Sequence, residues 1–171
     1  MHTNDENQKT TDLSAIIEGL VKADIEFILV GGLAAVIQGA PVTTMDVDIV
    51  HKRSSENISK LFQFLKSIDA IHRRPDDKII LPKEDDFSGH ALYATRLGPI
   101  DVLAFIEERK NYEDLLKYTV EIPFKGHTIL VLDIRTIIEL KKTSKDPKEK
   151  QRLLVFEETL RQLDENSDID K

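Results

Sequence analysis

The sequence contains no cysteine and no tryptophan in its 171 residues. Without cysteine it has no disulfide bond, no thiolate metal ligand and no cysteine nucleophile, which fits a cytoplasmic protein. Long hydrophobic runs are absent too, because charged residues interrupt every apolar stretch before it reaches the ~20 residues that span a membrane. Residues 1–7 are polar and acidic apart from Met1, which does not fit a signal peptide. We therefore expect no membrane partner.

Positive charge is scarce relative to negative charge. The chain has 24 Lys and Arg against 31 Asp and Glu, a formal net charge of −7. Such an acidic protein is poorly suited to cover a nucleic-acid backbone over a wide surface. A nucleotide or one end of an RNA would still fit a local basic pocket. The hydrophobic fraction of 40% and the charged fraction of 32% exclude a wholly disordered chain.

The length predicts one domain. Residues 1–10 have no apolar side chain after Met1 and are interpreted as a disordered leader. We expect a single domain over residues 11–164 and a polar tail over residues 165–171.

Hydrophobic periodicity and turn residues predict the elements of this domain. Residues 72–89 are polar and contain two prolines, which indicates a long loop or lid. Strands and helices are mixed, and a hairpin is expected around residues 125–126, so the fold class is predicted as α+β with a short mixed sheet flanked by helices. The expected helices cover about residues 12–24, 33–38, 54–67, 111–117, 133–142 and 146–163, and the expected strands 26–30, 45–50, 91–95, 100–105, 119–123 and 128–132.

Two carboxylates stand two residues apart in an apolar strand. Asp46 and Asp48 should share one face of that strand, while Met45, Val47 and Ile49 fill the other. Neighbouring carboxylates repel unless water, protonation or a cation relieves the repulsion. The pair fits either a solvated edge strand or a site for Mg²⁺, which prefers oxygen ligands.

A second motif lies just upstream. Gly31 and Gly32 separate an apolar strand from a short helix. Glycines at this place let a phosphate approach the backbone closely, or they serve a tight turn that needs positive φ.

A third acid, Asp101, is embedded among apolar residues of a later strand. It either faces water at a sheet edge or completes a carboxylate triad. Three acids that hold two metal ions about 3.5–4 Å apart would serve in-line displacement at phosphorus.

Taken together, Gly31-Gly32, the short helix, Thr44-x-Asp46-x-Asp48 and the later Asp101 resemble the nucleotidyltransferase superfamily that includes DNA polymerase beta. The resemblance covers about residues 12–160 and is nearest to the small bacterial minimal and abortive-infection toxin-type nucleotidyltransferases. One position departs from the pattern, because Gln38 stands where many relatives carry histidine.

The resemblance implies a Mg²⁺-dependent transfer of a nucleoside monophosphate from an NTP, ATP by default, to a hydroxyl acceptor with release of pyrophosphate. Asp46, Asp48 and Asp101 would be the catalytic metal ligands, for Mg²⁺ or Mn²⁺. Asp101 would also help to deprotonate the acceptor. The backbone of Gly31 and Gly32 would hold the β- and γ-phosphates. The acceptor would be an RNA end such as a tRNA, a protein or a small molecule.

Further polar residues have two interpretations each. Lys141 and Lys145 would reach the triphosphate or would favour a helix C-terminus. Thr44 would orient the nucleotide or Asp46, or serve only the turn. The pair Arg73-Arg74 would bind an acceptor or be solvated.

Two other functions stay open at this stage. The chain would be a non-catalytic nucleotide- or partner-binding relative, for example one component of a toxin–antitoxin pair with a cognate partner, or a metal-dependent phosphate hydrolase that uses the same acids. The presence of all three acids favours the transferase.

Overall fold

The computed structural model describes residues 11–170, so the expected leader lies outside the described residues. The described chain forms a seven-stranded sheet in the order β3-β4-β5-β2-β1-β7-β6. The strands are β1 (Phe27–Val30), β2 (Val47–His51), β3 (Ile71–His72), β4 (His90–Ala94), β5 (Ile100–Leu103), β6 (Thr119–Phe124) and β7 (His127–Leu132). The α-helices are α1 (Leu13–Lys22), α2 (Gly31–Ile37), α3 (Ser55–Ser67), α4 (Tyr112–Leu115), α5 (Ile134–Lys141) and α6 (Pro147–Ile169).

The sheet is mixed, which confirms the predicted α+β class. β1 runs antiparallel to β2 and parallel to β7, and β2 runs parallel to β5. β4–β5 and β6–β7 are antiparallel pairs, and the second is the hairpin predicted around residues 125–126. The parallel pairing of β2 with β5 places Asp48 directly opposite Asp101, two of the three acids predicted to form a site.

Helix starts follow the capping residues of the sequence. The side chain of Asp12 accepts a hydrogen bond from the backbone N of Ala15 at 2.9 Å at the start of α1. Ser54, Asp133 and Asp146 cap α3, α5 and α6 in the same way. Such caps satisfy backbone N–H groups that have no partner within the helix. The predicted starts of these helices are therefore confirmed.

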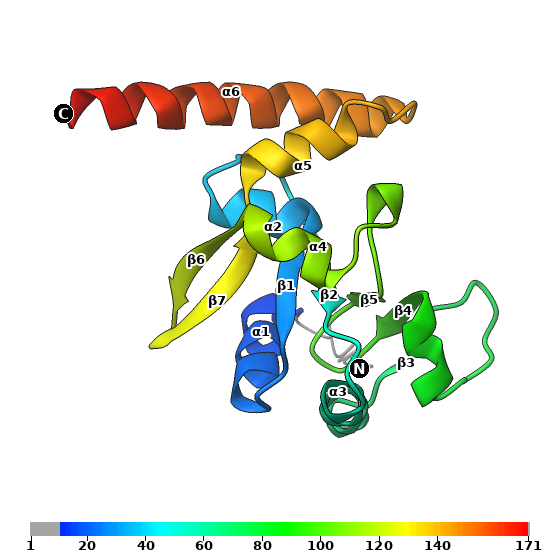
Figure 1. Ribbon diagram of the computed structural model, residues 1–171. Helices are drawn as coiled ribbons and strands as arrows, with labels where there is room; N and C mark the ends of the chain where they lie inside the picture. The colour runs from blue at the N-terminus through cyan, green and yellow to red at the C-terminus, as the bar shows by residue number, and fades with distance from the viewer. Residues whose placement is uncertain (1–10, 171) are drawn as a thin grey trace, which may run out of the picture.

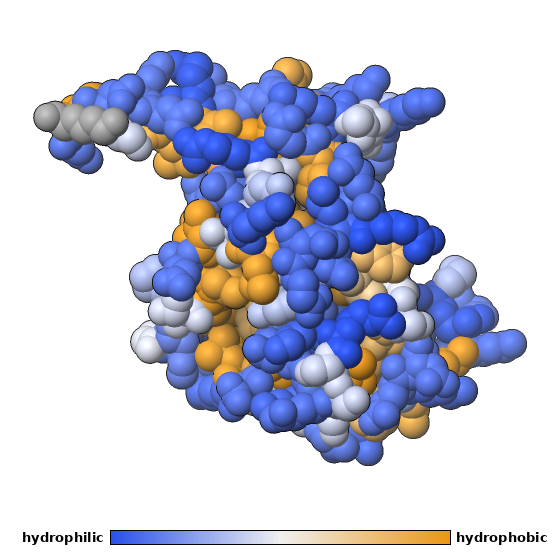
Figure 2. Space-filling view, in the orientation of Figure 1, coloured by the Kyte–Doolittle hydropathy of each residue, from blue (hydrophilic) through white to orange (hydrophobic). Residues whose placement is uncertain are grey.

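The hydrophobic core lies around the central strands. All four residues of β1 are buried, and Val47, Ile49 and Val50 of β2 are fully buried. Figure 1 shows α5 between α2 and α6, so these helices form successive layers beyond one end of the sheet. Hydrophilic residues cover most of the face shown in Figure 2, with smaller hydrophobic patches between them. None of the helices within residues 11–170 is both long and apolar enough to cross a membrane.

Gln38, which comes directly after α2, connects three elements. Its Nε2 donates to the carbonyl oxygens of Ala34 at 2.9 Å and Leu132 at 2.8 Å, and its Oε1 accepts from the N of Ile134 at 2.9 Å. These bonds join the end of α2 to the junction of β7 and α5. Gln38 thus has a structural role that fixes α2 beside the sheet.

Residues 72–89 are more ordered than a free loop. His72 belongs to the edge strand β3, and residues 84–88 form a 3₁₀ helix. The carboxylate of Asp86 accepts from the hydroxyl of Tyr93 at 3.1 Å and the backbone N of Lys83 at 2.7 Å, and it contacts His72 Nε2 at 2.7 Å. The expectation of a loop holds for residues 73–83 and for Gly89.

The last helix is longer than the sequence indicated. We expected a helix up to Leu163 and a polar tail after it, but α6 continues to Ile169. No glycine or proline interrupts this stretch. Ion pairs of Arg161 with Glu165 and of Arg135 with Asp164 also stabilise these last turns. The predicted helix end at Leu163 was therefore wrong, because a polar composition does not by itself end a helix.

Candidate metal and nucleotide site

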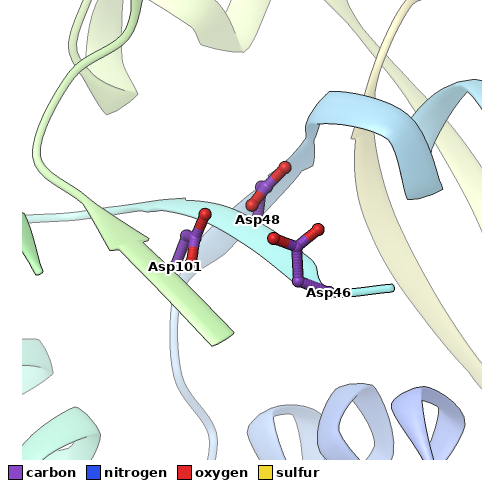
Figure 3. Close-up of side chains that lie close together, drawn as sticks. All are labelled: Asp46, Asp48 and Asp101. Atoms are coloured by element: carbon purple, nitrogen blue, oxygen red, sulfur yellow. The ribbon is translucent and has the colours of Figure 1, made fainter. Parts of the chain in front are cut away.

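The three acids come together at the N-terminal ends of the inner strands β2 and β5. In the parallel pair β2–β5, Asp48 lies directly opposite Asp101. Asp46 comes just before the first residue of β2, two residues from Asp48. One carboxylate oxygen of each residue lies within 4.8 Å of the other two, and Figure 3 shows the three side chains converging. The strand itself is shorter than expected, and Met45 is exposed rather than packed beneath the sheet.

The electrostatics of the cluster are unfavourable without a cation. Burial, followed by the neighbouring carboxylates of Asp101 and Asp46, raises the pKa of Asp48 to about 8. Burial and the charge of Asp101 likewise raise the pKa of Asp46. Within the described residues, the buried Oδ1 of Asp48 has no hydrogen-bond partner. A buried acceptor without a hydrogen bond raises the free energy of the folded protein. A cation bound at the three carboxylates would lower it.

The residues fit a divalent metal ion. The donor set consists of three carboxylates, and hard cations such as Mg²⁺ take oxygen ligands and keep sites for substrate phosphates. Among the described residues Asp48 Oδ1 has no hydrogen-bond partner, so this oxygen is available as a ligand atom. The donor set alone does not distinguish Mg²⁺ from Mn²⁺, since both accept carboxylate oxygens.

Two arginines that the sequence did not assign to the site lie beside the acids. Arg73 Nη2 donates to Asp101 Oδ1 at 2.6 Å, so Arg73 is not simply solvated, whereas its neighbour Arg74 pairs with Asp76. Arg152 of α6 lies near enough to Asp46 for its charge to oppose the rise in the pKa of that carboxyl. Arg152 is 106 positions from Asp46 in the chain, and no local motif links the two.

Gly31 touches the acid cluster directly. It follows Val30, which pairs with Asp48 across β1 and β2, and it has a φ of +72°. A Cβ at this position would lie 2.1 Å from Asp48 Oδ2. Of the two interpretations of this glycine, the positive φ is confirmed, whereas a contact with phosphate stays a prediction; the close approach that the structure shows is to a carboxylate.

The structure separates the other predicted nucleotide-binding residues. Thr44 Oγ1 donates to the carbonyl oxygen of Asp46 at 3.4 Å, and a Cβ on Gly32 would lie 3.2 Å from the same hydroxyl oxygen. Lys141 lines the pocket at the acids, where it pairs with Glu107 at 3.2 Å and Glu149 at 3.3 Å. Lys145 is exposed and does not line that pocket.

A cavity of about 510 Å³ opens beside the acids. Its walls combine Asp48, Asp101 and Lys141 with an apolar side from β4, β5 and the segment after them. That side was not recognised in the sequence, because only the β4–β5 pairing brings residues of β4 beside those of β5. The apolar side of the cavity consists of Leu92, Leu103, Phe105 and Ile106, and His90 also lines the cavity.

The glutamates that hold Lys141 were also missed. Glu107 belongs to the 3₁₀ turn Glu107–Arg109 and Glu149 to the first turn of α6. Partial burial opposes the charge of Lys141, but these two glutamates outweigh it and raise the pKa of Lys141. Lys141 is therefore a cation held in place by two carboxylates at the wall of the cavity.

Comparisons with known proteins place this geometry in a known fold. No family model matches the chain, and no curated protein matches its sequence. Solved structures do match. The lincosamide antibiotic adenylyltransferase LnuA, in a lincomycin-bound structure, has a TM-score of 0.56 at 10% identity, covering 84% of this chain and 92% of its own.

Two further structures agree with the first. ANT(2'')-Ia in complex with adenylyl-2''-tobramycin gives a TM-score of 0.53 at 14% identity, covering 86% of this chain and 88% of its own. An antigenic nucleotidyltransferase-like protein from Paracoccidioides brasiliensis gives 0.51 at 17% identity, covering 84% and 72%. At these identities the likeness concerns the fold. With its mixed sheet and the converging acids of β2 and β5, the chain has the nucleotidyltransferase fold.

Proposed function

We propose that this protein transfers a nucleoside monophosphate from an NTP to a hydroxyl group of an acceptor. The observation that carries the proposal is the convergence of Asp46, Asp48 and Asp101, with one oxygen of each within 4.8 Å of the others. A fold gains nothing in stability from acids so placed, because burial and the neighbouring carboxylates oppose the ionisation of Asp46 and Asp48. Such perturbed groups at the wall of a cavity are typical of functional sites.

In the proposed reaction the acceptor oxygen attacks the α-phosphorus. The bond from the α-phosphorus to the bridging oxygen of the β-phosphate breaks, and pyrophosphate leaves with that electron pair. Asp101 accepts the proton of the acceptor hydroxyl. A divalent ion bound by the three carboxylates, with Mg²⁺ or Mn²⁺ as the candidates, would neutralise phosphate charge and lower the pKa of the attacking hydroxyl.

The chain's own residues would position the triphosphate. Gly31 and Gly32 would offer their backbone N–H groups to the phosphates, since neither has a side chain that covers the backbone, and Thr44 lies beside Gly32. Lys141, fixed by Glu107 and Glu149, brings a positive charge to the cavity wall. Lys145 is less well placed, so we assign it at most a contact made outside the cavity. Catalysis would then rest on positioning and charge neutralisation.

A small-molecule acceptor suits the site best. The cavity of about 510 Å³ has an apolar wall next to Asp101 and lies in a protein of net charge −7. Those features favour a compact acceptor over a long RNA, which needs a wide basic surface. The structural neighbours solved with lincomycin and with adenylyl-2''-tobramycin support the same class. A tRNA end and a protein side chain remain outcomes of the assay.

The test is a transfer assay with each α-³²P-labelled NTP, Mg²⁺ and separate acceptors: tRNA, cell protein, a lincosamide and an aminoglycoside. We expect pyrophosphate release and a labelled acceptor with one of these, with ATP as the first nucleotide to try. The double variant Asp46→Asn/Asp48→Asn should lose at least about 100-fold of this activity. Asp77→Asn, which removes an exposed acid, should keep it.

The products also separate the transferase from a metal-dependent phosphate hydrolase. Transfer releases pyrophosphate and leaves the nucleotide on the acceptor, whereas hydrolysis gives free nucleotide or phosphate without an acceptor. If wild type yields neither pyrophosphate nor labelled acceptor with any NTP, the transferase proposal is wrong.

One observation favours a second candidate, a non-catalytic nucleotide- or partner-binding protein. Arg73 already donates to Asp101 at 2.6 Å and so supplies part of the positive charge that a metal would bring. Such a protein would bind nucleotide without turnover, in the cytoplasm, for example as one component of a toxin–antitoxin pair. Nucleotide binding without any product, weakened in Arg73→Gln, would support this candidate over the enzyme.

A further inference from the structure

We propose that Arg152 of α6 binds the β- and γ-phosphates of the nucleotide, so that the last helix supplies part of the triphosphate site. This inference rests on the proposed function and assigns a substrate-binding role to a residue outside the three acids, the glycines and Lys141. It also means that the triphosphate would lie between the sheet and α6.

The position of Arg152 carries the first part of the argument. Its Nη2 donates to the carbonyl oxygen of Thr43 at 2.6 Å, in the segment that leads to Asp46. Its Nη1 would lie 3.2 Å from a Cβ on Gly32, as would the hydroxyl oxygen of Thr44. The guanidinium and the hydroxyl therefore face the same small space, which exists because residue 32 has no side chain.

The charge of Arg152 carries the second part. The guanidinium has five N–H donors, and one bond to a neutral carbonyl leaves most of them available. Arg73 forms an ion pair with Asp101, but Arg152 forms none with any carboxylate of residues 11–170. A half-buried, unpaired guanidinium beside an open backbone is suited to a phosphate, which it contacts through two parallel N–H groups.

The location also distinguishes the phosphates. Arg73 lies at Asp101, where the acceptor would be deprotonated, whereas Arg152 lies at Gly32 and Thr44. The two arginines thus mark different sides of the acid cluster. Arg152 belongs to the side of the leaving pyrophosphate, so it should contribute to the binding of triphosphates and little to the binding of monophosphates.

A purely structural role is the competing explanation. Arg152 would then only join α6 to the Thr43 carbonyl, and its replacement would loosen the helix without a preference for phosphate number. Arg152→Gln separates the two roles, because glutamine keeps an N–H donor for Thr43 but loses the charge. Arg152→Lys keeps the charge and loses the planar pair of donors.

The experiment measures binding of inorganic tripolyphosphate, α,β-methylene-ATP and AMP by calorimetry with Mg²⁺ present. Because tripolyphosphate has no base, the result does not depend on which nucleotide is used. We expect Arg152→Gln to weaken the binding of tripolyphosphate and of α,β-methylene-ATP by about tenfold or more, and that of AMP by less than about twofold. Arg152→Lys should recover part of the loss.

Lys150→Gln is the matched control. It removes the same charge from α6 at an exposed residue two positions away, which lies on another face of the helix. It should leave the affinity for tripolyphosphate within about twofold of wild type. Equal losses in both variants would mean a general effect of charge and would overturn the proposal.

A second measurement uses the wild-type protein and so does not depend on a variant that folds. Phenylglyoxal modification followed by mass spectrometry should show that Mg²⁺-tripolyphosphate protects Arg152, whereas exposed Arg96 stays reactive. No protection of Arg152, or unchanged affinity in Arg152→Gln, overturns the proposal. The transfer assay tests the proposed reaction separately. If wild type transfers the nucleotide but Arg152→Gln binds tripolyphosphate as well as wild type does, only the inference is wrong. If Arg152→Gln loses affinity for triphosphates alone but wild type transfers nothing, only the proposed reaction is wrong.

Discussion

At the scale of single residues, Gly31 decides whether Asp48 can stand beside the end of β1. Its φ is +72°, and a Cβ there would lie 2.1 Å from Asp48 Oδ2. Gly31→Ala should therefore displace the carboxylate as well as strain the backbone.

Gly126→Ala provides the reference for this prediction. Gly126 has a φ of +79° but open space around its Cα, so alanine there carries only the backbone cost, about 1–2 kcal/mol. Gly31→Ala should cost a further ~1–3 kcal/mol of unfolding free energy from the clash and should weaken Mn²⁺ binding. Urea unfolding and calorimetry measure both. Equal stability of the two variants would contradict the contact with Asp48.

The raised pKa of Asp48 predicts how stability depends on pH without metal. Between about pH 4 and 8 the folded protein holds a proton on Asp48 that the unfolded chain has lost, because the folded pKa is about 8 and the ordinary value is 3.8. The free energy of unfolding should therefore fall as pH rises through this window.

Asp48→Asn should remove most of this slope and stabilise the metal-free protein at pH 8, by on the order of 2 kcal/mol. Urea midpoints of both proteins in EDTA, measured from pH 4 to 9, give the difference. Added Mg²⁺ or Mn²⁺ should restore stability at pH 8 in wild type and not in the Asp46→Asn/Asp48→Asn variant. A slope that is the same in wild type and Asp48→Asn would refute the assignment.

At the scale of elements, the side-chain amide of Asn57 in α3 forms hydrogen bonds with the backbone next to β1 and β2. Asn57 is 3% exposed, and its Oδ1 accepts from the N of Glu26 at 2.7 Å. Its Nδ2 donates to the carbonyl oxygens of Glu26 at 2.9 Å and Lys52 at 2.8 Å. The start of β1 and the end of β2 are thereby held against the same helix.

Asn57→Ala should leave these backbone groups without partners and cost about 2–4 kcal/mol of unfolding free energy. Gln63→Ala removes an exposed amide from the same helix and should change stability by less than about 0.5 kcal/mol. Chemical denaturation of the two variants measures the contrast. A loss in Asn57→Ala no larger than in Gln63→Ala would show that the bonds are not needed.

At the scale of the whole molecule, α6 has two parts with different contacts. Its first half reaches the site through Arg152 and packs through Phe156, which is 3% exposed. Its last turns extend away from the body in Figure 1, and Ile169 is 79% exposed.

Removal of residues 164–171 should therefore cost about 1 kcal/mol or less, mainly through the surface ion pair of Arg135 with Asp164. Phe156→Ala should cost about 3–4 kcal/mol, because it leaves a cavity between α6 and the core. Tripolyphosphate binding should survive the truncation, since Arg152 stays. Thermal and urea unfolding give the stabilities. A truncation as costly as Phe156→Ala would mean that the last turns pack more than their exposure indicates.

The sequence by itself determined the local features of this protein. Caps such as Asp12 and Asp146, the apolar strands and the pair Asp46-x-Asp48 depend on short-range rules, so they could be recognised without a structure. Residues 164–169 were the exception, because a polar composition does not exclude a surface helix.

Only the tertiary structure decided which distant residues meet. The parallel pairing of β2 and β5 sets Asp101 opposite Asp48, and the return of α6 brings Arg152 to Gly32. The tertiary structure also brings Arg73 into hydrogen-bond contact with Asp101 and places Lys145 outside the cavity lining. These contacts depend on strand order and helix packing over separations of up to 120 positions, as for Gly32 and Arg152, and no local pattern encodes them. The acid pair and Lys141 could therefore be predicted from the sequence, whereas the positions of Arg73 and Arg152 beside the acids could not.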